Sequence, residues 1–156
     1  MKIDIFRIAP EAQESARCLV GRVFMEFVAP DYSEEGVTSF LKFIHNEAMF
    51  KDLEVWGAWC EGSLVGVIAL DKQKQHIVLF FVDQRYHRCG IGKNLFRLAV
   101  KESVGNKITV NSSPFGVPIY EKLGFFADQN EQTVDGIRYT PMTYWKVAKG
   151  GNDTPS

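Results

Sequence analysis

Two glycines stand one residue apart at the junction between an apolar strand and an amphipathic helix, in the stretch YHRCGIGKNLF at residues 86–96. A strand that runs directly into a helix leaves the first amides of that helix without partners, and together with the helix dipole these amides attract an anion. Gly90 and Gly92 have no side chain to block a close approach to the backbone. Arg88 and Lys93 add positive charge. The junction therefore predicts a binding site for a diphosphate.

Two familiar nucleotide-binding patterns fit this junction poorly. A dinucleotide fold requires a third glycine in GxGxxG, and that position is Leu95. A P-loop requires Ser or Thr after the Gly-Lys pair, and that position is Asn94. Two glycines at this spacing can also form a tight turn and nothing more. The identity of the ligand therefore depends on a second landmark.

The composition is that of an ordinary globular chain. Its 156 residues suit one domain, with 46% hydrophobic and 24% charged residues. A net charge of −1 argues against nucleic acid or an anionic membrane as a partner, and no run of about 18 apolar residues could span a bilayer. The charges near the start do not fit a signal peptide. Cys18, Cys60 and Cys89 form no CxxC pair, which argues against disulfides and zinc. We expect a cytoplasmic protein without a metal site.

Apolar periodicity divides the chain into strands and helices. The segment HIVLFFV at residues 76–82 predicts a central strand that is covered on both faces. The expected order is β-α-α-β-β-β-α-β-α-β-β, a single-domain α/β fold with a mixed sheet and helices on both faces. The domain is expected over residues 1–148, followed by a disordered tail at 149–156. Strands are expected at 2–9, 53–60, 63–70, 76–82, 107–110, 125–134 and 137–147, and helices at 10–28, 33–50, from 91 to near 105, and from about 117 to 124.

The second landmark is the segment VNSSPFGVPIYEKLGF at residues 110–125, about twenty residues after the glycine loop. Taken together, the two segments resemble the GNAT superfamily of N-acetyltransferases. The loop pattern of that superfamily is Q/R-x-x-G-x-G/A, and HRCGIG at residues 87–92 fits it except at the first position. His87 stands where Gln or Arg is usual. The resemblance covers the whole chain in element order.

The resemblance implies transfer of an acetyl group from acetyl-CoA to an amine. In such proteins the central strand splays from its neighbour before the loop, and backbone groups there pair with the pantetheine arm. Ser113 stands where the family often has an asparagine that contacts the coenzyme, with Asn111 as an alternative, and either residue could equally be a helix cap. The coenzyme-binding residues that the resemblance implies are Phe80, Phe81 and Val82 at the strand end, Arg88, Cys89, Gly90, Ile91, Gly92 and Lys93 in the loop, and Asn111 or Ser113.

Tyr120 occupies the position of the family's general acid, which would protonate the leaving thiolate. The backbone N–H of Val82 is expected to stabilise the oxyanion that forms when the amine attacks. A phenol with a pKa of about 10 is a weaker acid than a thiol near 8.5, so this proton transfer is uphill by about 2 kcal/mol. The alternative for Tyr120 is an aromatic ring that packs against the sheet.

A general base is not evident from the sequence. Many relatives place a glutamate on the central strand, but residues 77–82 carry no carboxylate. His76 begins that strand, and the pKa of an imidazole suits a base, although a histidine at a strand end is often simply solvated. The other candidates are Glu26, His45 and Glu54, or a chain of ordered water molecules.

The acceptor amine is expected between the first two helices and the final hairpin, which usually wall the acceptor site in this fold. These segments are aromatic and also carry Glu26, Asp31, Glu34 and Glu35, so an acidic mouth would suit a cationic amine. Most of these residues fit better as core aromatics beside a solvated helix face.

Other functions remain compatible with the sequence. One is a non-catalytic CoA-binding or sensor module of the same fold, against which Tyr120 argues. Another is a domain that binds a protein through its hairpin without CoA, against which the glycine loop argues. Succinyl-CoA or propionyl-CoA could replace acetyl-CoA as the donor. The expected partners are an amine substrate and a second copy of the chain in a homodimer.

Overall fold

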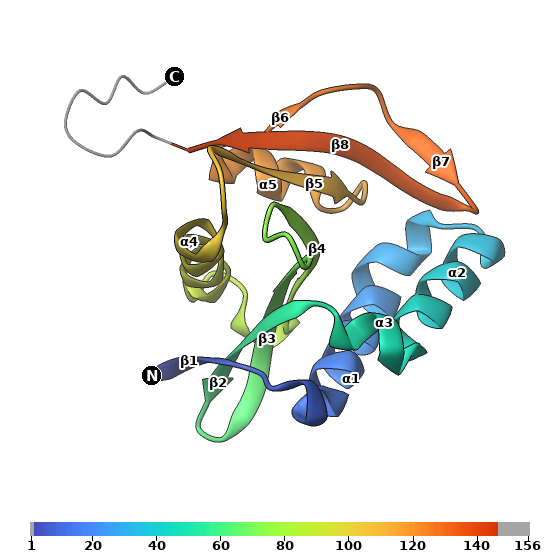
Figure 1. Ribbon diagram of the computed structural model, residues 1–156. Coiled ribbons are helices and arrows are strands. Elements are labelled where there is room, and N and C mark those ends of the chain that lie inside the picture. Colours follow the sequence, from blue (N-terminus) through green and yellow to red (C-terminus); the bar gives the residue numbers. More distant parts are fainter. Residues whose placement is uncertain (1, 147–156) are drawn as a thin grey trace, which may run out of the picture.

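The computed structural model describes residues 2–146, in which eight strands form a mixed sheet (Figure 1). The strands follow the order β1-β2-β3-β4-β5-β8-β6, and the short β7 pairs with β8 outside this path. Every pair is antiparallel except β4 and β5. The central position predicted for β4 is therefore confirmed. The strands are β1 (Ile3–Arg7), β2 (Glu54–Cys60), β3 (Ser63–Leu70), β4 (His76–Val82), β5 (Lys107–Ser112), β6 (Phe126–Ala127), β7 (Gln132–Val134) and β8 (Ile137–Trp145).

Helices cover both faces of this sheet, as predicted (Figure 1). On one face, Leu95 of α4 and Tyr120 of α5 join a buried cluster with side chains of β3, β4 and β5. On the other face, Leu19 of α1 joins a second cluster with Val67 and Leu79. The helices are α1 (Glu14–Val23), α2 (Glu34–His45), α3 (Glu47–Lys51), α4 (Ile91–Glu102) and α5 (Val117–Leu123), with short helical turns η1 (Pro10–Ala12), η2 (Phe24–Val28), η3 (Ala29–Asp31) and η4 (Gln84–Tyr86).

Two predicted helices are divided into shorter pieces. The helix predicted over 10–28 consists of the 3-10 turn η1, the helix α1 and the π-helical turn η2. The helix predicted over 33–50 stops at Asn46, whose backbone is extended and whose side chain accepts a hydrogen bond of 3.1 Å from the N–H of Met49, starting α3. The cap predicted at Ser33 is confirmed, because its hydroxyl accepts a hydrogen bond of 3.2 Å from a backbone N–H in the first turn of α2.

The two predicted hairpin turns are both confirmed. Glu61 and Gly62 join β2 to β3 with φ angles of 50° and 83°, and Asp135 and Gly136 join β7 to β8 with φ angles of 52° and 78°. Two successive positive φ angles match the right-handed twist of the strands that they connect. The strand predicted over 125–134 is divided into β6 and β7, which both pair with β8.

The central strands β4 and β5 separate after a short parallel contact. Only His76 and Ile77 of β4 pair with β5. On its other edge, Ile77 faces Leu70 and Leu79 faces Ala69, so Val78 is an extra residue, a bulge that bends β4 as it leaves β5. The splay implied by the family resemblance is therefore present.

The hairpin of β7 and β8 is held against the start of α2 (Figure 1). Gly36 and Gly136 approach so closely that a Cβ atom on either would collide with the backbone of the other. The hydroxyl of Tyr32 donates a hydrogen bond of 3.2 Å to the carbonyl of Arg138, and the guanidinium of Arg138 donates one of 3.0 Å to the carbonyl of Asp31. These contacts fix the hairpin beside η3 and α2.

Two further expectations concern membrane crossing and the end of the domain. No helix within residues 2–146 is both long enough and apolar enough to cross a membrane. The predicted domain boundary at residue 148 and the predicted disordered tail at 149–156 lie outside the described residues.

Candidate active site

A cavity of about 570 Å³ lies at the splay between β4 and β5 and reaches both faces of the sheet. We call its two parts the loop side and the aromatic side. The loop side is formed by residues of the glycine loop, of the start of α4 and of α5, namely Arg88, Gly90, Gly92, Lys93, Tyr120 and Lys122. The aromatic side is formed by residues of η2, of the end of η3, of α2 and of the end of β4, namely Phe24, Phe27, Val28, Tyr32, Phe40 and Phe81.

The glycine loop places the start of α4 at the loop side of the cavity. Gly90 caps the helix with a left-handed backbone (φ 80°), and its carbonyl accepts the hydrogen bond of 3.0 Å from the N–H of Asn94 that closes the first turn. Ile91, Gly92 and Lys93 are the first three residues of the helix, so their amides have no acceptor within it.

The residues of this loop fit a diphosphate. A Cβ atom added at Gly92 would meet Phe80 Cζ at 3.6 Å, which is ordinary contact, so the protein leaves room there for another group. The side chains of Arg88 and Lys93 line the same part of the cavity. Backbone amides, a helix N-terminus and two cations around an open space are the donor set that a pyrophosphate requires.

Asp83 anchors the segment between β4 and the glycine loop. It is only 2% exposed, and it pairs with Arg22 of α1 at 3.0 Å and with Arg85 at 3.2 Å. It also accepts a hydrogen bond of 2.9 Å from the N–H of Arg85. These interactions, that of the Arg85 side chain above all, lower the pKa of Asp83 to about 2. Asp83 and Arg22 were not predicted from the sequence, although an aspartate directly after an apolar strand is a recognisable cap.

The end of β4 directs backbone groups into the splay. The N–H of Asp83 donates a hydrogen bond of 2.8 Å to Val65 on β3. Because successive amides of a strand point to opposite edges, the N–H of Val82 points away from β3, toward β5. The carbonyl of Val82 lies 2.9 Å from Nε2 of His87, a side chain that also lines the cavity. The sequence analysis treated His87 only as a departure from the family pattern.

Tyr120 lies between the glycine loop and the splayed strand β4. Its side chain lines the cavity but is only 8% exposed, with its ring against Phe80 at 6.0 Å and Phe125 at 5.1 Å between centroids. Burial raises the pKa of Tyr120 well above its usual value of 10.0. Its neighbour Gly116 allows this position, because a Cβ atom there would lie 2.7 Å from Ser112 Oγ and 3.2 Å from the Tyr120 ring.

Ser113 and Asn111 both line the cavity. The hydroxyl of Ser113 accepts a hydrogen bond of 3.1 Å from the N–H of Gly116, so it caps the turn that leads into α5. Asn111 belongs to β5, where it pairs with Pro141 of β8, and its side chain is exposed. Ser113 therefore has the capping role that the sequence allowed, at a position that also faces the cavity.

The four candidate bases named from the sequence are not among the residues that line the cavity. His76 lies at the closed end of the splay, where its Nδ1 is 2.7 Å from Thr109 Oγ1. Burial lowers the pKa of His76, and Asp71 opposes this effect. Glu54 pairs with Arg7 on the edge strand at 3.1 Å. The structure does not bring these residues together with Tyr120.

Two loop residues, Cys89 and Ile91, do not line the cavity. The side chain of Cys89 is exposed, and that of Ile91 is buried in the core beneath α4. Among the residues that the structure describes, no group of three or more His, Cys, Asp or Glu side chains could hold a metal ion.

The acidic mouth that the sequence left open for the acceptor segments does not form among the described residues, and the alternative of a solvated acidic helix face holds. Among the described residues, no Asp or Glu lines the cavity. Glu26, Asp31, Glu34 and Glu35 are all exposed. The reason is geometric, because η2 and α2 turn their aromatic side chains toward the cavity and their acids toward solvent.

Comparisons with known proteins agree with this geometry. Residues 28–146 match the family model described as acetyltransferase (GNAT) domain. Human N-alpha-acetyltransferase 30 is 29% identical over 133 residues, which cover 78% of this chain and 37% of that protein. The protein of the same name from Xenopus laevis is 28% identical, covering 78% of this chain and 49% of that protein. The chain thus spans less than half the length of these relatives.

Solved structures share the fold at low sequence identity. A GCN5-related N-acetyltransferase from Rhodopseudomonas palustris superposes with a TM-score of 0.76 at 24% identity, covering 93% of this chain and 96% of that one. The PaiA N-acetyltransferase from Thermoplasma acidophilum, in complex with coenzyme A, gives 0.72 at 20% identity, covering 93% and 99%. The family match, which covers most of the chain, carries the assignment: the chain belongs to the GNAT acetyltransferase family.

Proposed function

We propose that this protein transfers an acetyl group from acetyl-CoA to an amine, with both substrates bound at the same time. The observation that carries the proposal is a single cavity that joins three features: the open amides at the start of α4, the splayed edge of β4 and the side chain of Tyr120. Each feature would contact a different part of acetyl-CoA.

The loop side suits the pyrophosphate and the pantetheine arm. The amides of Ile91, Gly92 and Lys93 would donate to the phosphate oxygens, with Arg88 and Lys93 balancing their charge. The edge of β4 beyond Ile77 is free of β5, so the amide groups of the arm could pair with it as an added strand would. The carbonyl of Val82 could serve this purpose once His87 moves away from it.

The transfer step needs few protein groups, because the thioester is already activated. The lone pair of a neutral amine forms the new C–N bond, and the C–S bond breaks as CoA thiolate leaves. The amine loses one proton to water, and the departing thiolate takes one proton from water. The N–H of Val82, which points into the splay, would stabilise the oxyanion that develops between these events.

We assign Tyr120 the role of donor to the leaving sulfur. Its raised pKa keeps the hydroxyl protonated throughout the physiological pH range. The same burial makes full transfer of its proton costlier than for an exposed phenol, so a strong hydrogen bond to the developing thiolate is its main contribution. We assign His76, which bonds to Thr109, to holding β4 and β5 together rather than to proton removal.

Several narrower points stay predictions. They are acetyl rather than succinyl or propionyl as the acyl group, a homodimer, and a cytoplasmic location. The main alternative is a CoA-binding sensor that performs no transfer, and the position of Tyr120 at the cavity argues against it.

Release of free CoA thiol from acetyl-CoA, measured with a panel of amines, tests the proposal. We expect release that requires both the amine and the protein, together with a stoichiometric amount of acetylated amine by mass spectrometry. A protein that is stabilised by acetyl-CoA but releases no thiol with any amine would be a sensor and would contradict the proposed function.

A further inference from the structure

The two sides of the cavity differ in their charge. The cationic side chains that line it, Arg88, Lys93 and Lys122, come from the glycine loop and α5. The aromatic side contributes five aromatic residues and one valine, and no carboxylate of the described chain lines either side. The acceptor end is therefore apolar and offers no counter-ion to an ammonium group.

The aromatic side is a packed structure rather than a loose collection of rings. Phe24 stacks on Phe40 with 4.0 Å between centroids and 14° between planes, and it meets Tyr32 edge-on at 5.6 Å. Phe81 of β4 lies 6.0 Å from Phe40. The π-helical turn η2, a form that often marks functional sites, supplies Phe24 and Phe27 to this wall.

The one hydroxyl of the aromatic side is already engaged. Tyr32 donates its proton to the carbonyl of Arg138 at 3.2 Å, and burial raises the pKa of Tyr32 to about 12. It therefore stays neutral at physiological pH and supplies no negative charge. The nearby carboxylate of Glu131 forms an ion pair with the guanidinium of Arg138 at 2.8 Å, so its charge is already paired.

We propose that the acceptor is a weakly basic amine that carries a large apolar group, such as the α-amino group of a peptide or amino-acid amide with an aromatic side chain. This inference rests on the proposed acetyl transfer and narrows its substrate. The amine enters as the free base, because burial of an ammonium group without a counter-ion is strongly unfavourable. The apolar group occupies the aromatic side.

Ionisation alone gives this site a strong preference. At about pH 7.5, roughly a quarter to two-fifths of an α-amino group with a pKa near 7.7–8.0 is unprotonated, compared with about one part in a thousand for an alkylamine near 10.4. The resulting preference for the weaker base is about 200- to 300-fold. Burial of a phenyl group adds about 10- to 150-fold over an amine without one.

Four amines separate these two effects. Phenylalaninamide is weakly basic and aromatic, glycinamide weakly basic and small, 2-phenylethylamine strongly basic and aromatic, and putrescine strongly basic and aliphatic. At about pH 7.5 we expect kcat/KM for phenylalaninamide to exceed that for glycinamide at least tenfold and that for putrescine at least a hundredfold. With 2-phenylethylamine, kcat/KM should rise about tenfold per pH unit up to the pKa of the amine.

The pH dependence of kcat/KM must be attributed to the amine substrate and not to a side chain of the protein. The titratable side chains that line the cavity are Tyr32, Tyr86, His87, Arg88, Lys93, Tyr120 and Lys122. His87 is the imidazole among these residues of the described chain. The rise with 2-phenylethylamine should persist in His87→Gln, because it belongs to the substrate.

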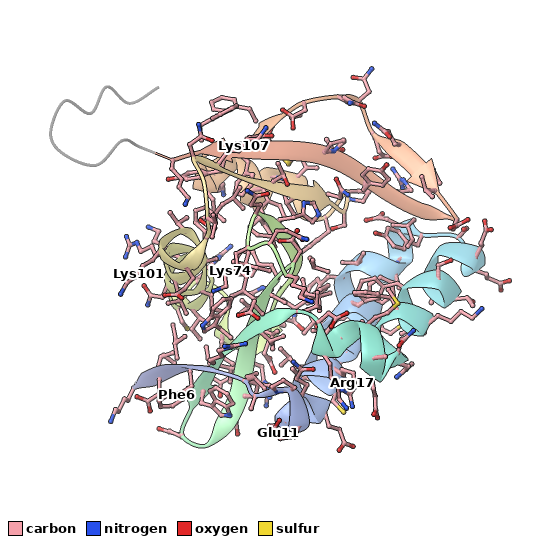
Figure 2. The ribbon with its side chains drawn as sticks, in the orientation of Figure 1. Phe6, Glu11, Arg17, Lys74, Lys101 and Lys107 are labelled. Atoms are coloured by element: carbon pink, nitrogen blue, oxygen red, sulfur yellow. The ribbon has the colours of Figure 1, made fainter. Side chains whose placement is uncertain are left out.

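Two substitutions on the aromatic side test its role directly. Phe40→Ala and Phe27→Ala should each lower the ratio of kcat/KM for phenylalaninamide to that for glycinamide at least fivefold, since a buried phenyl contact is lost. The matched control is Phe6→Ala on β1 (Figure 2), a 59% exposed residue that is not among the cavity-lining residues and should leave the ratio unchanged. An acetyl-CoA-dependent rise in melting temperature verifies that each variant is folded.

The outcomes distinguish the proposed class of acceptor from the proposed acetyl transfer. Turnover that favours putrescine, or that treats glycinamide and phenylalaninamide alike, would overturn the inference and leave acetyl transfer intact. Absence of thiol release with all four amines, from a protein that acetyl-CoA stabilises, would overturn both. An aromatic preference that disappears in Phe40→Ala or Phe27→Ala and survives in Phe6→Ala supports the inference.

Discussion

Replacement of Gly92 by valine should weaken acetyl-CoA binding about 150-fold or more without disturbing the fold. The new Cβ atom would meet its nearest neighbours, Phe80 Cζ and Val82 Cγ2, at 3.6 and 3.8 Å, so the protein itself accommodates it. The free energy of unfolding should change by less than about 1 kcal/mol, because valine has a slightly higher helix propensity than glycine. The valine side chain, however, fills the space above the amides of Ile91 and Lys93.

The expected loss of affinity follows from these amides. Two hydrogen bonds to a charged phosphate contribute about 1.5–3 kcal/mol each, so their loss weakens binding by at least 3 kcal/mol, or about 150-fold. At 100 times the parent's Kd, acetyl-CoA stabilises the parent by about 2.7 kcal/mol, and the variant by only about 0.3 kcal/mol. For a chain of this size the parent's melting temperature should then rise by about 5–11 °C and that of the variant by about 1 °C.

Thermal melts of both proteins with and without acetyl-CoA provide the measurement. Gly21→Ala serves as a matched control, because this helical glycine of α1 is not among the cavity-lining residues and its new Cβ would meet only the flexible end of Ile44, at 3.3 Å. The control should retain the full ligand-induced rise. A Gly92→Val protein that responds to acetyl-CoA like the parent would refute the reasoning and reduce the loop to a turn.

Two further substitutions test Tyr120, the proposed donor to the leaving sulfur, and Asp83, which anchors the segment after β4. Tyr120→Phe should lower kcat at least tenfold with KM nearly unchanged, since the hydroxyl acts on the leaving sulfur. Steady-state kinetics measure this effect, and an unchanged kcat under conditions where chemistry is rate-limiting would contradict the role of Tyr120. Asp83→Asn should lower the free energy of unfolding by about 1–2 kcal/mol, after allowance for solvent around its exposed arginine partners. Because the pKa of Asp83 falls from 3.8 to about 2 on folding, this stabilisation is present above about pH 4 and is lost as the pH falls toward 2, so denaturant melts of parent and variant should converge there.

Local signals in the sequence predicted most of the fold. The apolar run at residues 76–82, the glycine pairs at the hairpins and the cap at Ser33 each determine their structure through short-range chemistry. The break at Asn46 was missed because the apolar stripe continues through it, although the residue is itself a good cap. The π-helical turn at Phe24 was missed for a similar reason, since its residues continue the pattern of α1.

The site was predictable only in part, because long-range packing places most of it. The glycine loop and Tyr120 belong to motifs that can be recognised in sequence, and both line the cavity. The direction in which η2 and α2 turn their acidic side chains has no such signal, so the sequence alone did not decide whether an acidic mouth forms. The partnership of Asp83 with Arg22 joins residues 61 positions apart, and His76 lies at the closed end of the splay rather than at its mouth.

Amide hydrogen exchange with and without coenzyme A tests most directly whether the splayed strand and the glycine loop form the coenzyme site. We predict slower exchange at residues 78–82 of β4 and at residues 90–93 on binding, with little change in β1 and β2, which do not line the cavity. NAD at the same concentration should leave both segments unchanged. Protection confined to other elements, or an equal response to NAD, would contradict the account.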